Sequence, residues 1–403
     1  MKRLCAAIAL WLWLFNLVSA QAAPFKSHEL TAQDAVLVLD EQGEPLFDWR
    51  SDQALIPASL TKLVTAYLAL EKWGADHRFK TAFYYQNHTL WIQGFGDPYL
   101  ISEEIELIAK QLLAHGVTDV ATIRTDSHYF DITAVPGRSR VDDPYNAPLA
   151  ALSANFNTVM LQRRGQEVVS AETQTPLTPL ARTFGAKVGT KVSRVNLVTA
   201  QNAQRYFAEL LAAKAGWASP KIVVDQRVPN DLKAIYRHSN SRNLADTLRG
   251  ALEYSNNLIA NHVFLKLAEK PGSSSVSFDA AVAEATSSLS AQFAWSNFVM
   301  RDGAGLTREN RFSARQLAQV LGQLQGHRQL LKPYLMDRDD VCVYAKTGTL
   351  DGVHSFAGFI ELEQQPLRFV FVFNRPMPYQ YRLHLLRDLV AALQAGELRP
   401  TVR

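Results

Sequence analysis

The sequence predicts a mixed α/β chain of the α+β kind, with an antiparallel sheet, flanking helices and a second, smaller α/β unit. Two strand-like runs form a hairpin near the start of the chain, and further runs form an antiparallel meander near its end. Between them, helical patterns alternate with short strands. At 403 residues the chain is too long for one ordinary core, so at least two units are expected.

The first 22 residues have the pattern of a secretory signal peptide. Lys2 and Arg3 form the positive start, an almost continuous apolar run follows over residues 4–18, and residues 20–22 (Ala-Gln-Ala) form a cleavage site. A retained membrane anchor is the alternative, but the run is shorter than the ~20 residues that span a bilayer. We therefore expect export to the periplasm. Nothing in the pattern indicates peripheral membrane association.

Composition excludes several classes of function. Only Cys342 remains after cleavage, so no intramolecular disulfide is expected and the core alone must hold the fold. Removing Lys2 and Arg3 lowers the formal charge from +4 to +2, and no basic run is interleaved with aromatics, so a nucleic-acid partner is not expected. The histidines (among them His77, His88, His115 and His238) lack metal-ligand spacing and no phosphate loop occurs, so we expect no metal or other cofactor and interpret these histidines as structural.

In chain order, the first half predicts a hairpin, a helix and then a small α/β unit. Residues 35–39 and 45–49 are strands joined by a turn. A core-facing helix then begins near Ser59 and ends near residue 73. The small α/β unit contains short strands over 81–92, a turn at 94–98, a helix over 102–115 and a strand over 120–124.

The second half predicts helices followed by the meander. Residues 165–194 are rich in Thr, Pro, Gln and Gly and are expected to be irregular or a small β element. Helical patterns cover 203–213, 244–253 and 258–269, strands cover 341–345, 355–361 and 367–374, and a last amphipathic helix covers 383–393. Arg382, Arg387 and Asp388 give that helix mixed polarity, so we expect it to pack on the meander rather than bind a membrane.

The first chemical motif is Ser59 with Lys62. Three positions apart on a helix, the two side chains share a face, so the amine can reach the hydroxyl and act as its base if it is neutral. Desolvation and a nearby cation such as Lys346 would lower its pKa. Alone the pattern is weak, because a helix start with a solvated lysine looks the same.

The second motif is Ser255 with Asn257, at the corner between two predicted helices. The hydroxyl can relay a proton and the amide can hold a substrate peptide group. Ser153 and Asn155 fit the same pattern. Ser255 is preferred for its flanking helices and its nearness in sequence to the third motif, but Ser153 remains a rival.

The third motif, Lys346-Thr347-Gly348-Thr349, is the most specific. A lysine on an edge strand offers a positive charge, the two hydroxyls can bind a carboxylate, and a glycine lets a substrate backbone approach closely. The motif predicts a cleft for a peptide with a free C-terminal carboxylate. A lysine in a β-turn is the structural alternative.

Ser-x-x-Lys, Ser-x-Asn and Lys-Thr-Gly in this order are the motif set of β-lactamases and penicillin-binding proteins. Beyond them the chain resembles the low-molecular-mass D-alanyl-D-alanine carboxypeptidase/endopeptidase family, peptidase family S13. The resemblance covers most of the mature chain and is carried by residues 57–59, 94–98, 147–152, 301–306 with Asn310, 346–350 and 357–359.

The resemblance implies a transpeptidase-like catalytic domain over 23–78 and 200–403, split by an inserted region over 79–199. It implies that Ser59 is acylated, with Lys62 as its base, and that the oxyanion hole uses the backbone N–H groups of Ser59 and Thr349. Ser255 would relay a proton and Asn257 would hold the substrate. The terminal carboxylate would lie against the third motif, namely Lys346, Thr347, Gly348 and Thr349.

The implied partners are peptidoglycan peptides as substrates and β-lactam antibiotics as covalent inhibitors. The family pattern commonly has Asp at position 256 and Ser at position 304, where this chain has Asn256 and Ala304. A β-lactamase is one alternative, although the only Glu followed four residues later by Asn is Glu253 with Asn257, which is already assigned. A catalytically silent cell-wall binding protein of the same fold is another.

Overall fold

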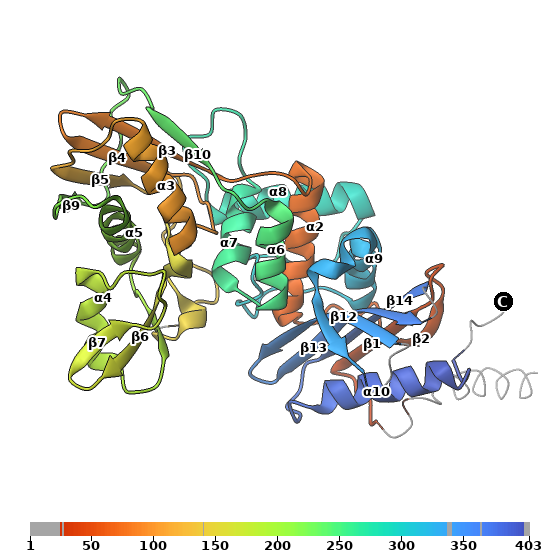
Figure 1. Ribbon diagram of the computed structural model, residues 1–403. Helices are drawn as coiled ribbons and strands as arrows, with labels where there is room; N and C mark the ends of the chain where they lie inside the picture. Colours follow the sequence, from red (N-terminus) through yellow and green to blue (C-terminus); the bar gives the residue numbers. More distant parts are fainter. Residues whose placement is uncertain (1–24, 26–27, 140, 337–340, 363–364, 399–403) are drawn as a thin grey trace, which may run out of the picture. The chain divides into compact units, whose positions relative to one another are not determined.

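The computed structural model describes Phe25 and residues 28–139, 141–336, 341–362 and 365–398 (Figure 1). The predicted signal peptide, residues 1–22, lies outside them. The described residues divide into two compact units, which we treat separately. The first draws on Met1–Leu63, Asn297–Val299 and Arg308–Arg403, and the second on Val64–Ser296 and Met300–Thr307. The boundaries expected from the sequence, at residues 79 and 199, remain a prediction.

The first unit is built on a sheet of six described strands in the order β11-β12-β13-β14-β1-β2, with every neighbouring pair antiparallel. Strands far apart in the sequence meet in its middle, where β1 pairs with β14 from Asp34↔Phe373 to Leu39↔Arg368. The strands are β1 (Asp34–Leu39), β2 (Pro45–Trp49), β11 (Lys332–Leu335), β12 (Val341–Leu350), β13 (Val353–Leu362) and β14 (Gln365–Phe373).

Helices cover both faces of this sheet. Successive strand residues point to opposite faces, and one face carries Val36, Val38 and Phe371 in a core shared with Leu386 and Leu389 of α10 (Tyr381–Gln394). The helix α9 (Ala314–Leu324) contacts β1, β13 and β14, and Figure 1 shows α9 and α10 on opposite sides of the sheet. The prediction that the last helix packs on the meander is confirmed.

The second unit contains two sheets among its described residues. The larger, β10-β3-β4-β5-β9, is mixed, because β3 is antiparallel to β10 and β4 whereas β5 is parallel to β4 and β9. The smaller, β7-β6-β8, is antiparallel. The strands are β3 (Lys80–Gln86), β4 (Thr89–Gly94), β5 (Thr122–Asp126), β6 (Thr158–Arg164), β7 (Glu167–Ser170), β8 (Ser193–Asn196), β9 (Lys221–Val223) and β10 (Tyr236–Ser239).

Amphipathic helices complete the second unit. Ile105, Ile108 and Leu112 recur at helical spacing along α3 and share a core with Phe207 and Leu211 of α5. The helices are α2 (Thr61–Trp73), which begins within the first unit, α3 (Ser102–Ala114), α4 (Pro179–Thr183), α5 (Ala200–Ala215), α6 (Leu244–Glu253), α7 (Asn257–Lys266) and α8 (Phe278–Phe293). No helix in the described part of the chain is both long enough and apolar enough to cross a membrane.

Candidate active site

The first motif lies at the junction of the 3₁₀ turn η2 (Ala58–Leu60) and α2. Ala58 has a φ of 50°, a left-handed conformation that an alanine adopts only when its surroundings impose it. The turn carries Ser59, and one helical turn later the buried Lys62 donates through Nζ to Ser59 Oγ at 3.0 Å. The contact between the two side chains that their spacing predicts is therefore present.

The third motif lies on β12, where Lys346 pairs with Ala357 and Gly348 with Ser355 of β13. The sequence places this lysine on an edge strand, and the structure corrects that expectation. Among the described residues β11 is the edge strand, and it pairs with β12 from Cys342 to Ala345. Lys346 is the first residue of β12 beyond that pairing, so the motif begins where β11 no longer pairs with β12.

Gly348 brings β12 against the serine turn. A Cβ built on Gly348 would lie 2.9 Å from Ser59 N and 2.8 Å from Pro57 O, closer than real Cβ atoms come to other atoms. Ser355 holds the turn in this place, because its buried hydroxyl donates to Pro57 O at 2.7 Å. Glycine is therefore required here by the approach of two backbone segments, in addition to any approach of a substrate.

Lys346 is buried, with 2% of its surface exposed, and its Nζ donates to the carbonyl oxygen of Thr347 at 2.7 Å. Burial lowers the pKa of Lys346 well below its ordinary value, and the nearby charges of Lys62, Arg382 and Lys332 act in the same direction. The positive charge of Lys62 thus adds to the effect of burial on the pKa of Lys346.

Arg382, which the sequence predicts only as part of the mixed polarity of the last helix, is a second cation beneath the motif. It is 2% exposed, and its Nη1 donates to Gly348 O at 2.9 Å, Thr349 Oγ1 at 3.0 Å and Ser355 O at 3.2 Å. The signal was available, because Arg382 precedes the core residues Leu386 and Leu389 by four and seven positions and therefore shares their helix face. A guanidinium keeps its charge when buried.

The second motif lies in the second unit, at the corner between α6 and α7. Ser255 has a φ of 55°, which is uncommon for a serine. Asn256 caps α7 by accepting a hydrogen bond from Ile259 N at 3.1 Å, so the middle residue of the motif has a structural task. Asn257 opens α7, and its Nδ2 donates to Tyr145 O at 2.9 Å.

The rival serine has a structural environment. Ser153 is 2% exposed, donates through Oγ to Ala150 O at 2.8 Å and accepts from Asn157 Nδ2 at 3.0 Å. Asn155 is also engaged, since its Oδ1 accepts from Ser102 N at 2.9 Å. These bonds hold both groups within the fold, and the choice of Ser255 as the second-motif serine stays a prediction. In the described residues, no group of three or more His, Cys, Asp or Glu side chains is placed to hold a metal ion.

Comparison with known proteins identifies the family and the fold of the chain. The sequence matches the profile of the D-Ala-D-Ala carboxypeptidase 3 (S13) family over residues 21–182 and 185–337. A D-alanyl-D-alanine carboxypeptidase of Actinomadura sp. (strain R39) is 34% identical over 161 residues, or 37% of this chain and 29% of the relative. The D-alanyl-D-alanine carboxypeptidase DacB of Haemophilus influenzae is 26% identical over 187 residues, or 40% of this chain and 38% of the relative. The matched regions thus span well under half of these curated relatives.

Solved structures show the same fold. Penicillin binding protein 4 (dacB) from Haemophilus influenzae superposes with a TM-score of 0.69 at 19% identity, covering 93% of this chain and 99% of that one. Bd3459, a predatory peptidoglycan endopeptidase from Bdellovibrio bacteriovorus, gives a TM-score of 0.53 at 13% identity, covering 91% and 93%. The predicted α+β fold class and the predicted family are confirmed. The chain belongs to the D-Ala-D-Ala carboxypeptidase 3 (S13) family.

Proposed function

We propose that the protein is a serine-type D-Ala-D-Ala carboxypeptidase or endopeptidase that acts on peptidoglycan stem peptides through an acyl-enzyme at Ser59. The observation that carries this proposal is the 3.0 Å contact between Lys62 Nζ and Ser59 Oγ, beside the strand that holds the Lys346-Thr347-Gly348 motif. Membership in the S13 family supports the same reaction. The leader pattern of residues 1–22 favours export to the periplasm.

In the proposed acylation, neutral Lys62 takes the proton of Ser59 while Oγ attacks the carbonyl carbon between the two D-alanines. The backbone N–H groups of Ser59 and Thr349 stabilise the negative oxygen of the tetrahedral intermediate. The C–N bond then breaks, and the proton held by Lys62 passes through Ser255 to the leaving amine. Water finally hydrolyses the ester on Ser59, which releases the shortened peptide and restores the hydroxyl.

The terminal carboxylate of the substrate is proposed to bind at Thr347 and Thr349. Thr349 Oγ1 accepts a hydrogen bond from Arg382, so its own proton remains available to donate to a carboxylate oxygen. Lys346 and Arg382 add positive potential from beneath the strand. Because the pKa of Lys346 is lowered, Arg382 is the more constant source of this charge. Asn257 would hold the peptide group.

A covalent adduct with labelled penicillin at Ser59 is the first test. A β-lactam is expected to acylate the same serine, but its leaving group stays attached to the adduct. Bd3459 of Bdellovibrio bacteriovorus, which has the same fold, has been solved in a penicillin G acylated form. We expect the mature protein to label and Ser59→Ala not to label, with an unchanged melting temperature. Equal labelling of Ser59→Ala, or an unlabelled wild type, would remove the assignment of Ser59.

Digestion of purified muropeptides is the second test, because it separates the remaining activities. Release of free D-alanine identifies a carboxypeptidase, and cleavage of cross-linked dimers identifies an endopeptidase. Neither product, with intact binding of muropeptides, would indicate the silent binding protein. Rapid turnover of penicillin with no peptide cleavage would indicate a β-lactamase.

A further inference from the structure

A basic cavity of about 270 Å³ lies in the second unit, where β3 begins and α7 ends. It belongs to none of the three motifs. Its lining combines cations with aromatic rings and contains one carboxylate: His77, Arg78, Phe79, Lys80, Phe95, Arg237, Lys266 and Glu269. Four basic side chains, those of two arginines and two lysines, therefore face one acid, which gives the cavity a positive potential.

The cations line the cavity at two depths. Arg78, Lys80 and Arg237 are exposed at its edge. Lys266 is 4% exposed, and its Nζ donates to Phe95 O at 2.9 Å and lies 3.1 Å from a carboxylate oxygen of Glu269. Because Glu269 balances the buried lysine, the three exposed cations provide the excess charge that a ligand would meet.

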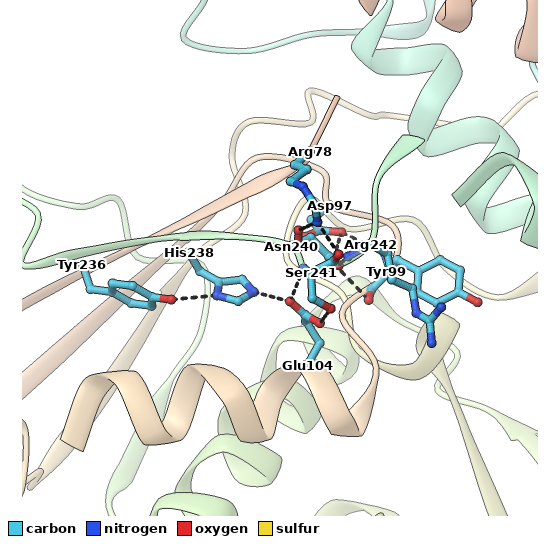
Figure 2. Close-up of polar contacts among 9 residues, drawn as sticks. All are labelled: Arg78, Asp97, Tyr99, Glu104, Tyr236, His238, Asn240, Ser241 and Arg242. Atoms are coloured by element: carbon cyan, nitrogen blue, oxygen red, sulfur yellow. Dashed lines mark hydrogen bonds and ion pairs between the residues drawn. The ribbon is translucent and has the colours of Figure 1, made fainter. Parts of the chain in front are cut away.

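The protein holds this basic edge in place through the network in Figure 2. Arg78 Nη1 donates to Asn240 O at 2.8 Å and also to Ser241 O. The side chain of Asn240 donates in turn to both carboxylate oxygens of the buried Asp97, at 3.1 and 2.9 Å. Asp97 and Phe95 both belong to the 94–98 segment, which has no role in the proposed catalytic reaction. Phe95 lines the cavity. The segment thus builds one wall and anchors one cation.

The network continues to the strand that carries Arg237. Glu104 accepts from Ser241 N at 2.7 Å and contacts His238 Nε2 at 2.6 Å, while His238 Nδ1 contacts Tyr236 Oη at 2.9 Å. His238 therefore has the structural role expected of it. The neighbouring Arg237 lies on a strand whose backbone is fixed at several points, so its Cα has a set position at the edge of the cavity.

The aromatic wall suits a ligand with a less polar body. His77 stacks on Trp73 with ring centroids 5.2 Å apart and meets Phe79 edge to face at 5.3 Å. Burial and the charge of Lys266 lower the pKa of His77, so near pH 7 its ring is neutral and can donate one hydrogen bond. A compact, multiply charged anion with a small organic substituent would match both the edge and the wall.

We propose that this cavity binds a phosphate ester, through Arg78, Lys80 and Arg237. Phosphate offers several oxygens to converging guanidinium and ammonium groups, whereas a carboxylate offers two and one charge. The ester can come from a phospholipid headgroup or from a soluble phosphorylated compound. The proposal is independent of the catalytic one, since it uses none of the motif residues.

Titration calorimetry at low ionic strength tests the cavity with inorganic phosphate and with glycerol 3-phosphate. The test variant is Lys80→Gln with Arg237→Gln, because both side chains are exposed. The matched control is Arg205→Gln with Lys221→Gln, which removes the same charge from exposed positions on α5 and β9, the latter at the opposite edge of the larger sheet from β10. We expect the test variant to bind glycerol 3-phosphate about tenfold or more weakly and the control to bind like wild type.

Vesicles distinguish the two sources. Binding to phosphatidylglycerol vesicles but not to phosphatidylcholine vesicles, lost in the test variant alone, would assign a lipid headgroup, whereas binding of glycerol 3-phosphate without vesicle binding would assign a soluble ester. Penicillin labelling of every variant shows that the active site is intact. No phosphate binding by wild type, equal weakening in the control, or acetate binding as tight as phosphate binding would overturn the proposal.

Discussion

Replacing Gly348 with alanine tests whether the approach of β12 to the serine turn is needed for acylation. The new Cβ would lie 2.2 Å from Ser355 Oγ, 2.8 Å from Pro57 O and 2.9 Å from Ser59 N. The last two are backbone atoms of the turn that holds Ser59, so no side-chain rotation relieves these two contacts. Since carbon contacts are optimal near 3.5 Å, the turn or the strand must move by roughly 0.5 Å.

A movement of this size displaces the backbone N–H of Ser59, one of the two proposed oxyanion donors. Loss of one such donor costs about 10²- to 10³-fold in rate, or roughly 3–4 kcal/mol of transition-state stabilisation. Overpacking also lowers the free energy of unfolding by about 1–3 kcal/mol. We therefore expect Gly348→Ala to remain folded at 25 °C while its acylation slows about a hundredfold or more.

The assay is the second-order rate constant for labelling by a fluorescent penicillin, measured beside a thermal unfolding curve. Gly326→Ala is the matched control, because a Cβ there meets nothing within 4 Å. The double variant Gly348→Ala with Ser355→Ala removes the 2.2 Å contact but leaves the two backbone contacts, so it should stay slow. Labelling of Gly348→Ala at the wild-type rate would refute the reasoning.

Three further predictions concern polar side chains. Arg382→Met leaves Gly348 O and Thr349 Oγ1 without their donor and should lower the free energy of unfolding in urea by about 2–4 kcal/mol, whereas an unchanged value would make Arg382 dispensable. Burial raises the pKa of Asp97 from 3.8 to about 6, so its contribution to stability is complete below pH 4 and is lost as the pH rises through 6. Urea unfolding of Asp97→Asn should lack this fall, which amounts to roughly 3 kcal/mol. Ser255→Ala should slow D-alanine release about a hundredfold or more without a change in melting temperature. Ser153→Ala should lower the melting temperature and leave the rate of D-alanine release unchanged, because its hydroxyl is bonded within the fold. The opposite pattern would make Ser153 the second-motif serine.

Elements with strong local signals were predictable from the sequence. The helix α6 spans Leu244–Glu253, as its apolar spacing predicts, and β2 spans Pro45–Trp49 as expected. The strand expected at 120–124 begins two residues later, at Thr122. Short elements without their own periodicity, such as α4, β9, β10 and β11, were not predicted. Strands of three or four residues are stable only through their pairing, which the local sequence does not encode.

The candidate site divides in the same way. By itself, the sequence determined the chemical groups and their order, and it placed Lys62 within reach of Ser59, because three positions along a helix is a local relation. Only the tertiary structure decided that Ser355 ties β13 to Pro57, that Arg382 lies beneath the third motif and that Ser153 is occupied by the fold. The bond from Ser355 to Pro57 joins residues 298 positions apart. Contacts over such separations arise from the packing of whole elements, so no spacing along the chain reveals them.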